Sequence, residues 1–186
     1  MLSFANIPNT LTLFRLVCIP IIIGCIIFQN FFLNWLALIL YILACLSDFF
    51  DGYIARKFSI ESTFGKFLDP IADKILVISI IFILVAISKI EGLLIFPSLI
   101  IIVREVLVSG LREFFVQNKP DINVSKLSKI KTFLQMVTLG FLIIGNDFIY
   151  IENIFLVGEI GLWLSSILTI YTGYIYFKNS FKFFEK

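Results

Sequence analysis

Four aspartates lie close together in a part of the chain whose flanks are almost entirely apolar. Asp48 and Asp51 are three residues apart. Asp69 and Asp73 are four apart, so each pair would share one face of a helix. Two adjacent antiparallel helices would direct the four carboxylates at a common centre, where they stay ionised only if cations neutralise them. The spacing therefore predicts a site for two divalent ions, which suits in-line displacement at phosphorus.

Small residues and one arginine accompany these acids. Gly52 follows Asp51 directly, and Ala55 and Gly65 are also small, which lets backbone and substrate approach closely. Arg56 can bind phosphate oxygens bidentately. Together these residues favour a substrate that carries phosphate.

The histidine and cysteine content narrows the chemistry further. The chain contains no histidine, which excludes imidazole bases and His-ligated zinc. Cys18, Cys25 and Cys45 fall in apolar runs without CxxC spacing, so we expect small buried hydrophobic side chains. Acid–base chemistry is left to carboxylates, Lys or Tyr, and a metal site would have oxygen ligands, as Mg²⁺, Mn²⁺ and Ca²⁺ prefer.

The elements that must position these residues are membrane helices. The chain has 186 residues, of which 60% are hydrophobic, and its mean hydropathy is +1.03. Apolar runs recur along the whole length, which predicts one all-α, polytopic membrane domain over residues 1–186. The first run is too long for a signal-peptide core, so we expect a retained helix. Six transmembrane helices are expected at about 7–28, 32–56, 65–88, 93–115, 125–145 and 154–177.

The basic residues predict how these helices are oriented. Every one of the 15 Lys and Arg residues except Lys89 falls on the side that holds both termini. Because cytoplasmic loops carry an excess of Lys and Arg, both termini are expected in the cytoplasm. The active site is then expected on the cytoplasmic half of the second and third helices.

A second group of charges lies on the fourth and fifth helices. Arg104 and Arg112 are eight residues apart and share similar faces of the fourth helix, while Lys129 and Lys131 open the fifth. Cations beside an anionic metal site suit a second substrate with its own phosphate. The alternative is that they merely follow the positive-inside rule, or pair with the glutamate that follows each arginine.

Two other interpretations of the acidic cluster stay open. The aspartates can form salt bridges with nearby Lys and Arg residues, although small residues between clustered acids are unusual in such an array. An ion or proton transporter also uses acids within the membrane. Against that class, nothing ionisable continues through the apolar halves of the second and third helices.

The acidic stretch also resembles a known family. The pattern D-x2-D-G-x2-A-R-x8-G-x3-D-x3-D is matched at every fixed position, and in this the chain resembles the CDP-alcohol phosphatidyltransferase family. The resemblance implies a six-helix, homodimeric membrane enzyme that uses Mg²⁺ or Mn²⁺ and a CDP-linked donor, with Asp73 as the base for the acceptor hydroxyl. The family's metal-holding positions match Asp48, Asp51, Asp69 and Asp73, and its nucleotide and pyrophosphate positions match Gly52, Ala55, Arg56 and Gly65.

Three further stretches, residues 7–15, 103–113 and 124–136, resemble the bacterial subfamily that makes phosphatidylglycerophosphate. This implies CDP-diacylglycerol as donor, and a location among the lipids of the bacterial inner membrane. It also implies sn-glycerol 3-phosphate as acceptor, its phosphate bound by the four cations of the fourth and fifth helices. Serine or another alcohol is the alternative acceptor, and no nucleic-acid partner is expected. Asn9 and Thr12 can reach the metal or the nucleotide, with helix capping as the alternative.

Overall fold

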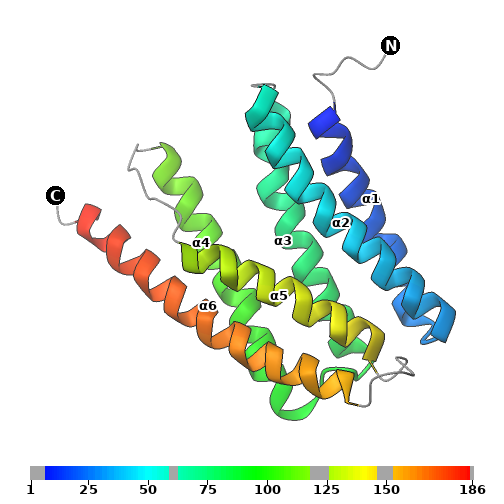
Figure 1. Ribbon diagram of the computed structural model, residues 1–186. Helices are drawn as coiled ribbons and strands as arrows, with labels where there is room; N and C mark the ends of the chain where they lie inside the picture. The colour runs from blue at the N-terminus through cyan, green and yellow to red at the C-terminus, as the bar shows by residue number, and fades with distance from the viewer. Residues whose placement is uncertain (1–6, 59–62, 118–125, 146–152, 185–186) are drawn as a thin grey trace.

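The computed structural model describes residues 7–58, 63–117, 126–145 and 153–184. Within these ranges the chain forms six long α-helices and one short 3-10 helix, η2 (Gly92–Leu94), which confirms the all-α prediction (Figure 1). The long helices are α1 (Ile7–Ile27), α2 (Phe31–Phe58), α3 (Thr63–Ala86), α4 (Ile95–Gln117), α5 (Lys126–Ile144) and α6 (Ile154–Phe184).

The helix boundaries agree with the predicted ranges except at the end of the chain. Helix α6 continues to Phe184, seven residues beyond the expected 177. No Pro or Gly follows Gly173, so no residue interrupts the helix where the apolar run gives way to Lys178 and later polar residues. The turn between α3 and α4 contains Gly92 at φ 56°, a left-handed conformation that glycine adopts readily.

Within the part of the chain that the structure describes, four helices are long and apolar enough to cross a membrane, which makes this a multi-pass membrane protein. Helix α2 contributes a shorter apolar segment, Phe31–Ser47. The described part of α3 carries Asp69, Asp73 and Lys74 near its start and has no charged residue from Ile75 onward. The four spans are Thr10–Ile27, Gly92–Arg112, Leu127–Ile144 and Ile154–Lys178.

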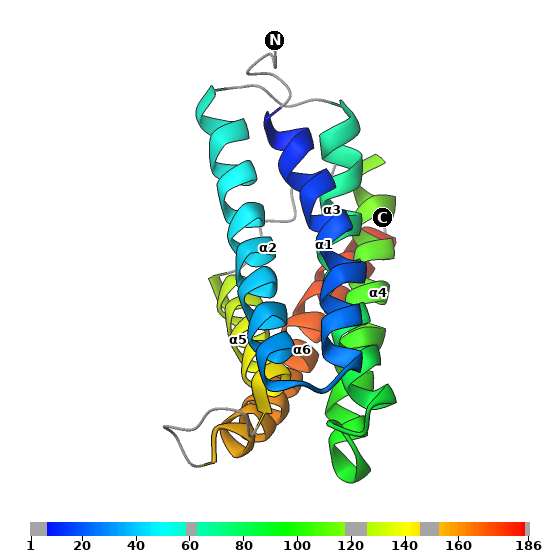
Figure 2. The same ribbon diagram turned by 90° about the vertical axis from the view of Figure 1, so that its right-hand side faces the viewer.

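Helix α1 packs against both α2 and α3 (Figures 1 and 2). Among the residues that the structure describes, α2 and α3 are not one of the helix pairs with extensive contacts, and the facing ends of these two helices lie mostly outside those residues. They do run in opposite directions, and the end of α2 lies at the same end of the bundle as the start of α3 (Figure 1). Thr12 and Arg15 of α1 contact aspartates of α3, and these contacts help to hold α1 beside α3.

Helices α5 and α6 pack closely through small residues. A Cβ on Gly161 would lie 2.5 Å from Thr138 Oγ1, and a Cβ on Gly158 would lie 2.8 Å from Leu142 Cδ2. Close approach through glycine is a common way to pack membrane helices, where lipid removes the hydrophobic drive for association. Helix α5 is therefore held between α6 and the pair α2 and α3, which it also contacts.

The apolar core joins these helices, and the cysteines belong to it as predicted. Cys18 and Cys25 are buried, Cys45 is half-buried, and all three are free thiols. At the end of the bundle opposite the acidic stretch, Lys89 donates a hydrogen bond to the Ile143 carbonyl over 2.7 Å. Lys89, which the sequence places on the side opposite the other Lys and Arg residues, thus links the turn after α3 to the end of α5.

Candidate active site

The described acids of α3 contact polar residues of α1. Thr12 is buried and donates a hydrogen bond to the Asp69 carboxylate. One turn further along α1, Arg15 is 0% exposed, and its Nη1 lies 3.8 Å from Asp73 Oδ1. A buried guanidinium needs a nearby anion, and this contact supplies one. Helix α1 thereby orients both carboxylates, which share one face of α3 because they are four residues apart.

Several predicted site residues have side chains outside those that the structure describes. The backbone of residues 48–58 continues α2 as a helix, so the acids of α2 keep their predicted three-residue helical spacing. Gly65 is buried in the first turn of α3. The predicted residues without a described side chain are Asn9, Asp48, Asp51, Ala55 and Arg56, and the environment of Gly52 is likewise outside the described part.

The donor atoms at the start of α3 fit a hard divalent cation. Asp69 and Asp73 are both partly exposed, with 37% of the Asp73 side chain accessible, while Asp73 Oδ1 itself is buried toward Arg15. Carboxylate oxygens are the ligands that Mg²⁺ and Mn²⁺ prefer. Among the described side chains, no three Cys, Asp or Glu residues come together as a metal site, and two of the four predicted ligands lie outside that part.

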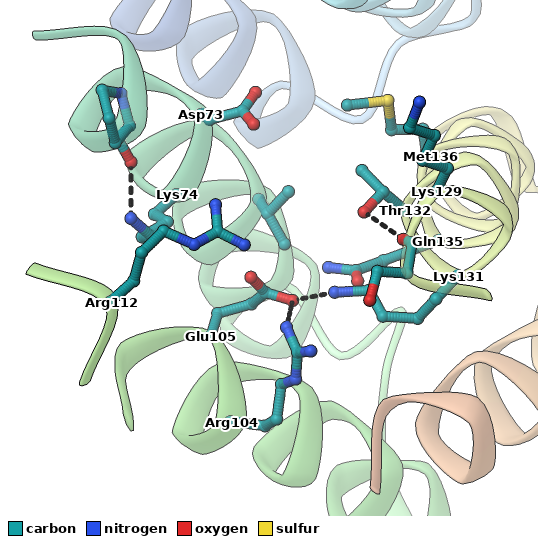
Figure 3. A pocket seen from close by; sticks show the side chains of 13 residues that line it. Asp73, Lys74, Arg104, Glu105, Arg112, Lys129, Lys131, Thr132, Gln135 and Met136 are labelled. Atoms are coloured by element: carbon teal, nitrogen blue, oxygen red, sulfur yellow. Dashed lines mark hydrogen bonds and ion pairs between the residues drawn. The ribbon is translucent and has the colours of Figure 1, made fainter. Parts of the chain in front are cut away.

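A cavity of about 210 Å³ lies between α3, α4 and α5 beside Asp73 (Figure 3). All four cations predicted for the second substrate line it: Arg104, Arg112, Lys129 and Lys131. The cavity therefore joins one carboxylate of the acidic stretch to cations that are more than 30 residues away in sequence. The remaining lining comes from Pro70, Lys74, Val77, Glu105, Ser128, Thr132, Gln135 and Met136.

Glu105 links two of these cations. Its Oε1 accepts a hydrogen bond from Lys131 Nζ and lies 3.4 Å from Arg104 Nη1 (Figure 3). The alternative interpretation, pairing with a neighbouring glutamate, is thus correct for Arg104, yet the same arginine still lines the cavity. Lys131 is buried, whereas Arg112 and Lys129 are exposed. The cavity has an ordered, ion-paired wall and two accessible cations at its rim.

Helix α6 also holds Arg104. The Arg104 Nη2 donates a hydrogen bond to Thr172 Oγ1 over 3.2 Å, and Thr172 itself donates to the Leu168 carbonyl over 2.8 Å. A Cβ on Gly173 would lie 3.3 Å from Arg104 Cγ, so this glycine leaves room for the arginine stem. Helix α6, for which the sequence predicts no chemistry, therefore positions a cation of the cavity.

Sequence reasoning did not select Arg15, Gln135 or Thr172. The signal for Arg15 is a lone cation within the first apolar run, three residues after Thr12. Gln135 lies four residues after Lys131 and therefore shares its face of α5. Thr172 carries no such signal, because Thr is common in membrane helices and its partner lies 68 residues away.

The arrangement suits an acid–base step next to an anion-binding wall. A small molecule with a phosphate at one end and a hydroxyl at the other can place the phosphate among the cations and the hydroxyl at Asp73. A carboxylate in that position can accept the hydroxyl proton as the oxygen attacks.

Comparison with known proteins identifies relatives over nearly the whole chain. A family model described as CDP-alcohol phosphatidyltransferase matches residues 5–171. A protein of Rickettsia bellii named CDP-diacylglycerol–glycerol-3-phosphate 3-phosphatidyltransferase is 48% identical over 179 residues, which cover 96% of this chain and 97% of that protein. A protein of the same name from Rickettsia felis is 46% identical, and the match again covers 96% of this chain and 97% of that protein. A third protein of this name, from Yersinia enterocolitica, is 33% identical over 95% of this chain and 96% of its own length.

Proposed function

The chain belongs to the CDP-alcohol phosphatidyltransferase family, and we propose that it transfers the phosphatidyl group of CDP-diacylglycerol to sn-glycerol 3-phosphate. The products are phosphatidylglycerophosphate and CMP, and the reaction is a step of phospholipid biosynthesis. Relatives whose printed name states this activity support the proposal over almost the full length. The observation that carries it is the single cavity that Asp73 shares with Arg104, Arg112, Lys129 and Lys131.

The donor is held at the acidic stretch. Enzymes of this family generally depend on a divalent metal, and Mg²⁺ or Mn²⁺ would be held by Asp48, Asp51, Asp69 and Asp73. Bound there, two ions would neutralise the pyrophosphate and stabilise the departing CMP. Gly52, Ala55 and Gly65 leave room for the nucleotide and pyrophosphate, and Arg56 pairs with a phosphate oxygen. Thr12 keeps the Asp69 carboxylate oriented through its hydrogen bond. The neighbouring Asn9 lies close enough in sequence to assist at the nucleotide.

The acceptor binds in the cavity. Its phosphate pairs with the cations of α4 and α5, and its free C1 hydroxyl lies at Asp73. Asp73 takes the hydroxyl proton while the oxygen forms a bond to the phosphatidyl phosphorus. The bond from that phosphorus to the bridging pyrophosphate oxygen breaks, and CMP leaves with the electron pair. Arg15 keeps the Asp73 carboxylate in place for this transfer.

We propose that the protein lies in the bacterial inner membrane as a single six-span domain with both termini in the cytoplasm. The excess of Lys and Arg at the end of the bundle that holds the acidic stretch supports this orientation. A substrate soluble in the cytoplasm then reaches the cavity directly, while CDP-diacylglycerol enters from the lipid. We further propose that the enzyme is a homodimer, as the family resemblance implies.

The proposed reaction is tested by following CMP release from CDP-diacylglycerol with purified protein and Mg²⁺ or Mn²⁺. We expect CMP with glycerol 3-phosphate and none with serine. Release with serine but not glycerol phosphate would refute the acceptor assignment. If no alcohol released CMP, the enzyme proposal would fail, and ion flux through proteoliposomes would then test the transporter alternative.

Replacing Thr172 with valine should raise the KM for glycerol 3-phosphate about threefold to tenfold, the worth of one hydrogen bond. Valine keeps the shape of threonine but cannot accept the hydrogen bond from Arg104. The KM for CDP-diacylglycerol should stay unchanged, and Thr172→Ser should restore the wild-type value. Steady-state kinetics with each substrate varied in turn measures this, and equal changes in both KM values would contradict it.

A further inference from the structure

Gln135 is a buried polar residue that the proposed mechanism does not use. Its side chain is 2% exposed, and its Oε1 has no hydrogen-bond partner among the described residues. It lies on α5 one turn after Lys131 and lines the cavity (Figure 3). A buried carbonyl oxygen is costly to leave without a donor, so such atoms in native proteins usually have a partner.

The neighbouring donors of α5 are directed elsewhere. Lys131 donates to Glu105, and Thr132 donates to the Ser128 carbonyl over 3.0 Å. A donor can still reach Gln135 through the cavity, which is large enough for several water molecules or one small ligand. The orphaned oxygen thus points to a hydrogen-bond donor carried by the ligand.

The two ends of the cavity already have assigned partners. The cations of α4 and α5 take the phosphate, and Asp73 takes the reacting C1 hydroxyl. In sn-glycerol 3-phosphate one polar group, the C2 hydroxyl, lies between these ends. A neutral amide suits a hydroxyl well, because it both accepts and donates hydrogen bonds without disturbing the charges around it.

We propose that Gln135 determines acceptor specificity by accepting a hydrogen bond from the C2 hydroxyl of glycerol 3-phosphate. The proposal rests on the proposed function and deepens it. A site with a buried group that pairs with a substrate hydroxyl discriminates against the analogue that lacks this hydroxyl, because the buried group is then left unpaired. Gln135 therefore separates glycerol phosphate from phosphate-bearing alcohols of the same length.

The experiment compares two acceptors, glycerol 3-phosphate and 3-hydroxypropyl phosphate, which lacks only the C2 hydroxyl. For each, kcat/KM is measured by CMP release from CDP-diacylglycerol. The wild-type protein should favour glycerol 3-phosphate by at least about tenfold, as expected for a recognised hydroxyl. Gln135→Met, which keeps the length of the side chain but not its amide, should reduce this preference to about onefold to twofold.

The ratio is independent of how much of the variant is folded, because both acceptors are assayed on the same preparation. Val137→Met places the same side chain two residues along α5 at an exposed position and should keep the wild-type ratio. Gln135→Asn, with a shorter amide, serves if the Met variant is inactive, and its ratio should also fall. A wild-type ratio near one, or an unchanged ratio in the Gln135 variants, would overturn the proposal. Absence of CMP from the wild type with glycerol 3-phosphate would instead refute the proposed function.

Discussion

Asp73→Asn is expected to lower kcat by about 10²-fold to 10⁴-fold, the usual contribution of a positioned general base. Asparagine has nearly the same shape as aspartate but cannot accept a proton or carry the charge that neutralises a divalent ion. The CMP-release assay under saturating acceptor and donor measures the loss. Because Asp73 is 37% exposed and contacts a fully buried Arg15, thermal unfolding in detergent should be recorded beside it to separate chemistry from stability.

A matched variant, Asp69→Asn, distinguishes proton transfer from metal binding. Asp69 lies one turn earlier on the same helix and accepts a hydrogen bond from Thr12. We expect this variant to be inactive at ordinary metal concentration and partly restored by excess Mg²⁺ or Mn²⁺. Activity of Asp73→Asn should not return under the same conditions. Retention of wild-type activity within tenfold in Asp73→Asn would remove Asp73 from the reaction.

Replacing Lys131 is expected to have the second large effect, on the binding of glycerol 3-phosphate. This ammonium is buried, pairs with Glu105 and lines the acceptor cavity. Replacing it with methionine should raise the KM for glycerol 3-phosphate about 10-fold to 100-fold, the worth of one charge-assisted hydrogen bond. It should also lower the unfolding temperature, since it removes the closer of the two cations that pair with Glu105 and leaves that carboxylate only Arg104.

The double variant Lys131→Met with Glu105→Gln separates these two roles. Glutamine removes the negative charge that the first change leaves without its closest cation, so the unfolding temperature should recover. The KM for glycerol 3-phosphate should stay high, because the phosphate still lacks its ammonium partner. Recovery of both quantities would show that Lys131 acts only through Glu105 and does not contact the acceptor.

Glu105 also influences which acceptor charge the cavity prefers. Its carboxylate pairs with both Arg104 and Lys131 at the cavity wall. An entering phosphate must compete with this carboxylate for the same two cations, and a dianion competes better than a neutral alcohol. The ion-paired wall thus adds to the preference for an acceptor that carries its own phosphate.

The helices were predictable because each one is decided locally. A membrane span needs about 20 apolar residues whatever its neighbours are, and the polar breaks between the runs set the ends to within a few residues. The exception is α6, whose final turns extend beyond the apolar run because the polar residues after 177 contain no Pro or Gly. The helical spacing of the four aspartates is equally local, which is why the acidic stretch could be interpreted from sequence.

The cavity depends on contacts between residues far apart in the chain. Arg104 meets Thr172 across 68 residues, and Glu105 meets Lys131 across 26. Helical periodicity shows which face a residue occupies but not which helix lies opposite, because lipid and protein neighbours are both apolar. For the same reason the position of α1 beside α3 was missed, and with it the contact of Arg15 with Asp73.

The residue order alone predicts a helical membrane protein with an acidic motif suited to phosphoryl transfer, because the apolar runs and the spacing within each aspartate pair are both set within single helices. Only the tertiary structure shows which side chains meet across helices. Thr12 and Arg15 contact the aspartates of α3, Thr172 binds Arg104, and Gln135 lines the cavity. These contacts join different helices, and their formation depends on how the helices pack, which glycine positions such as Gly161 and Gly173 make possible.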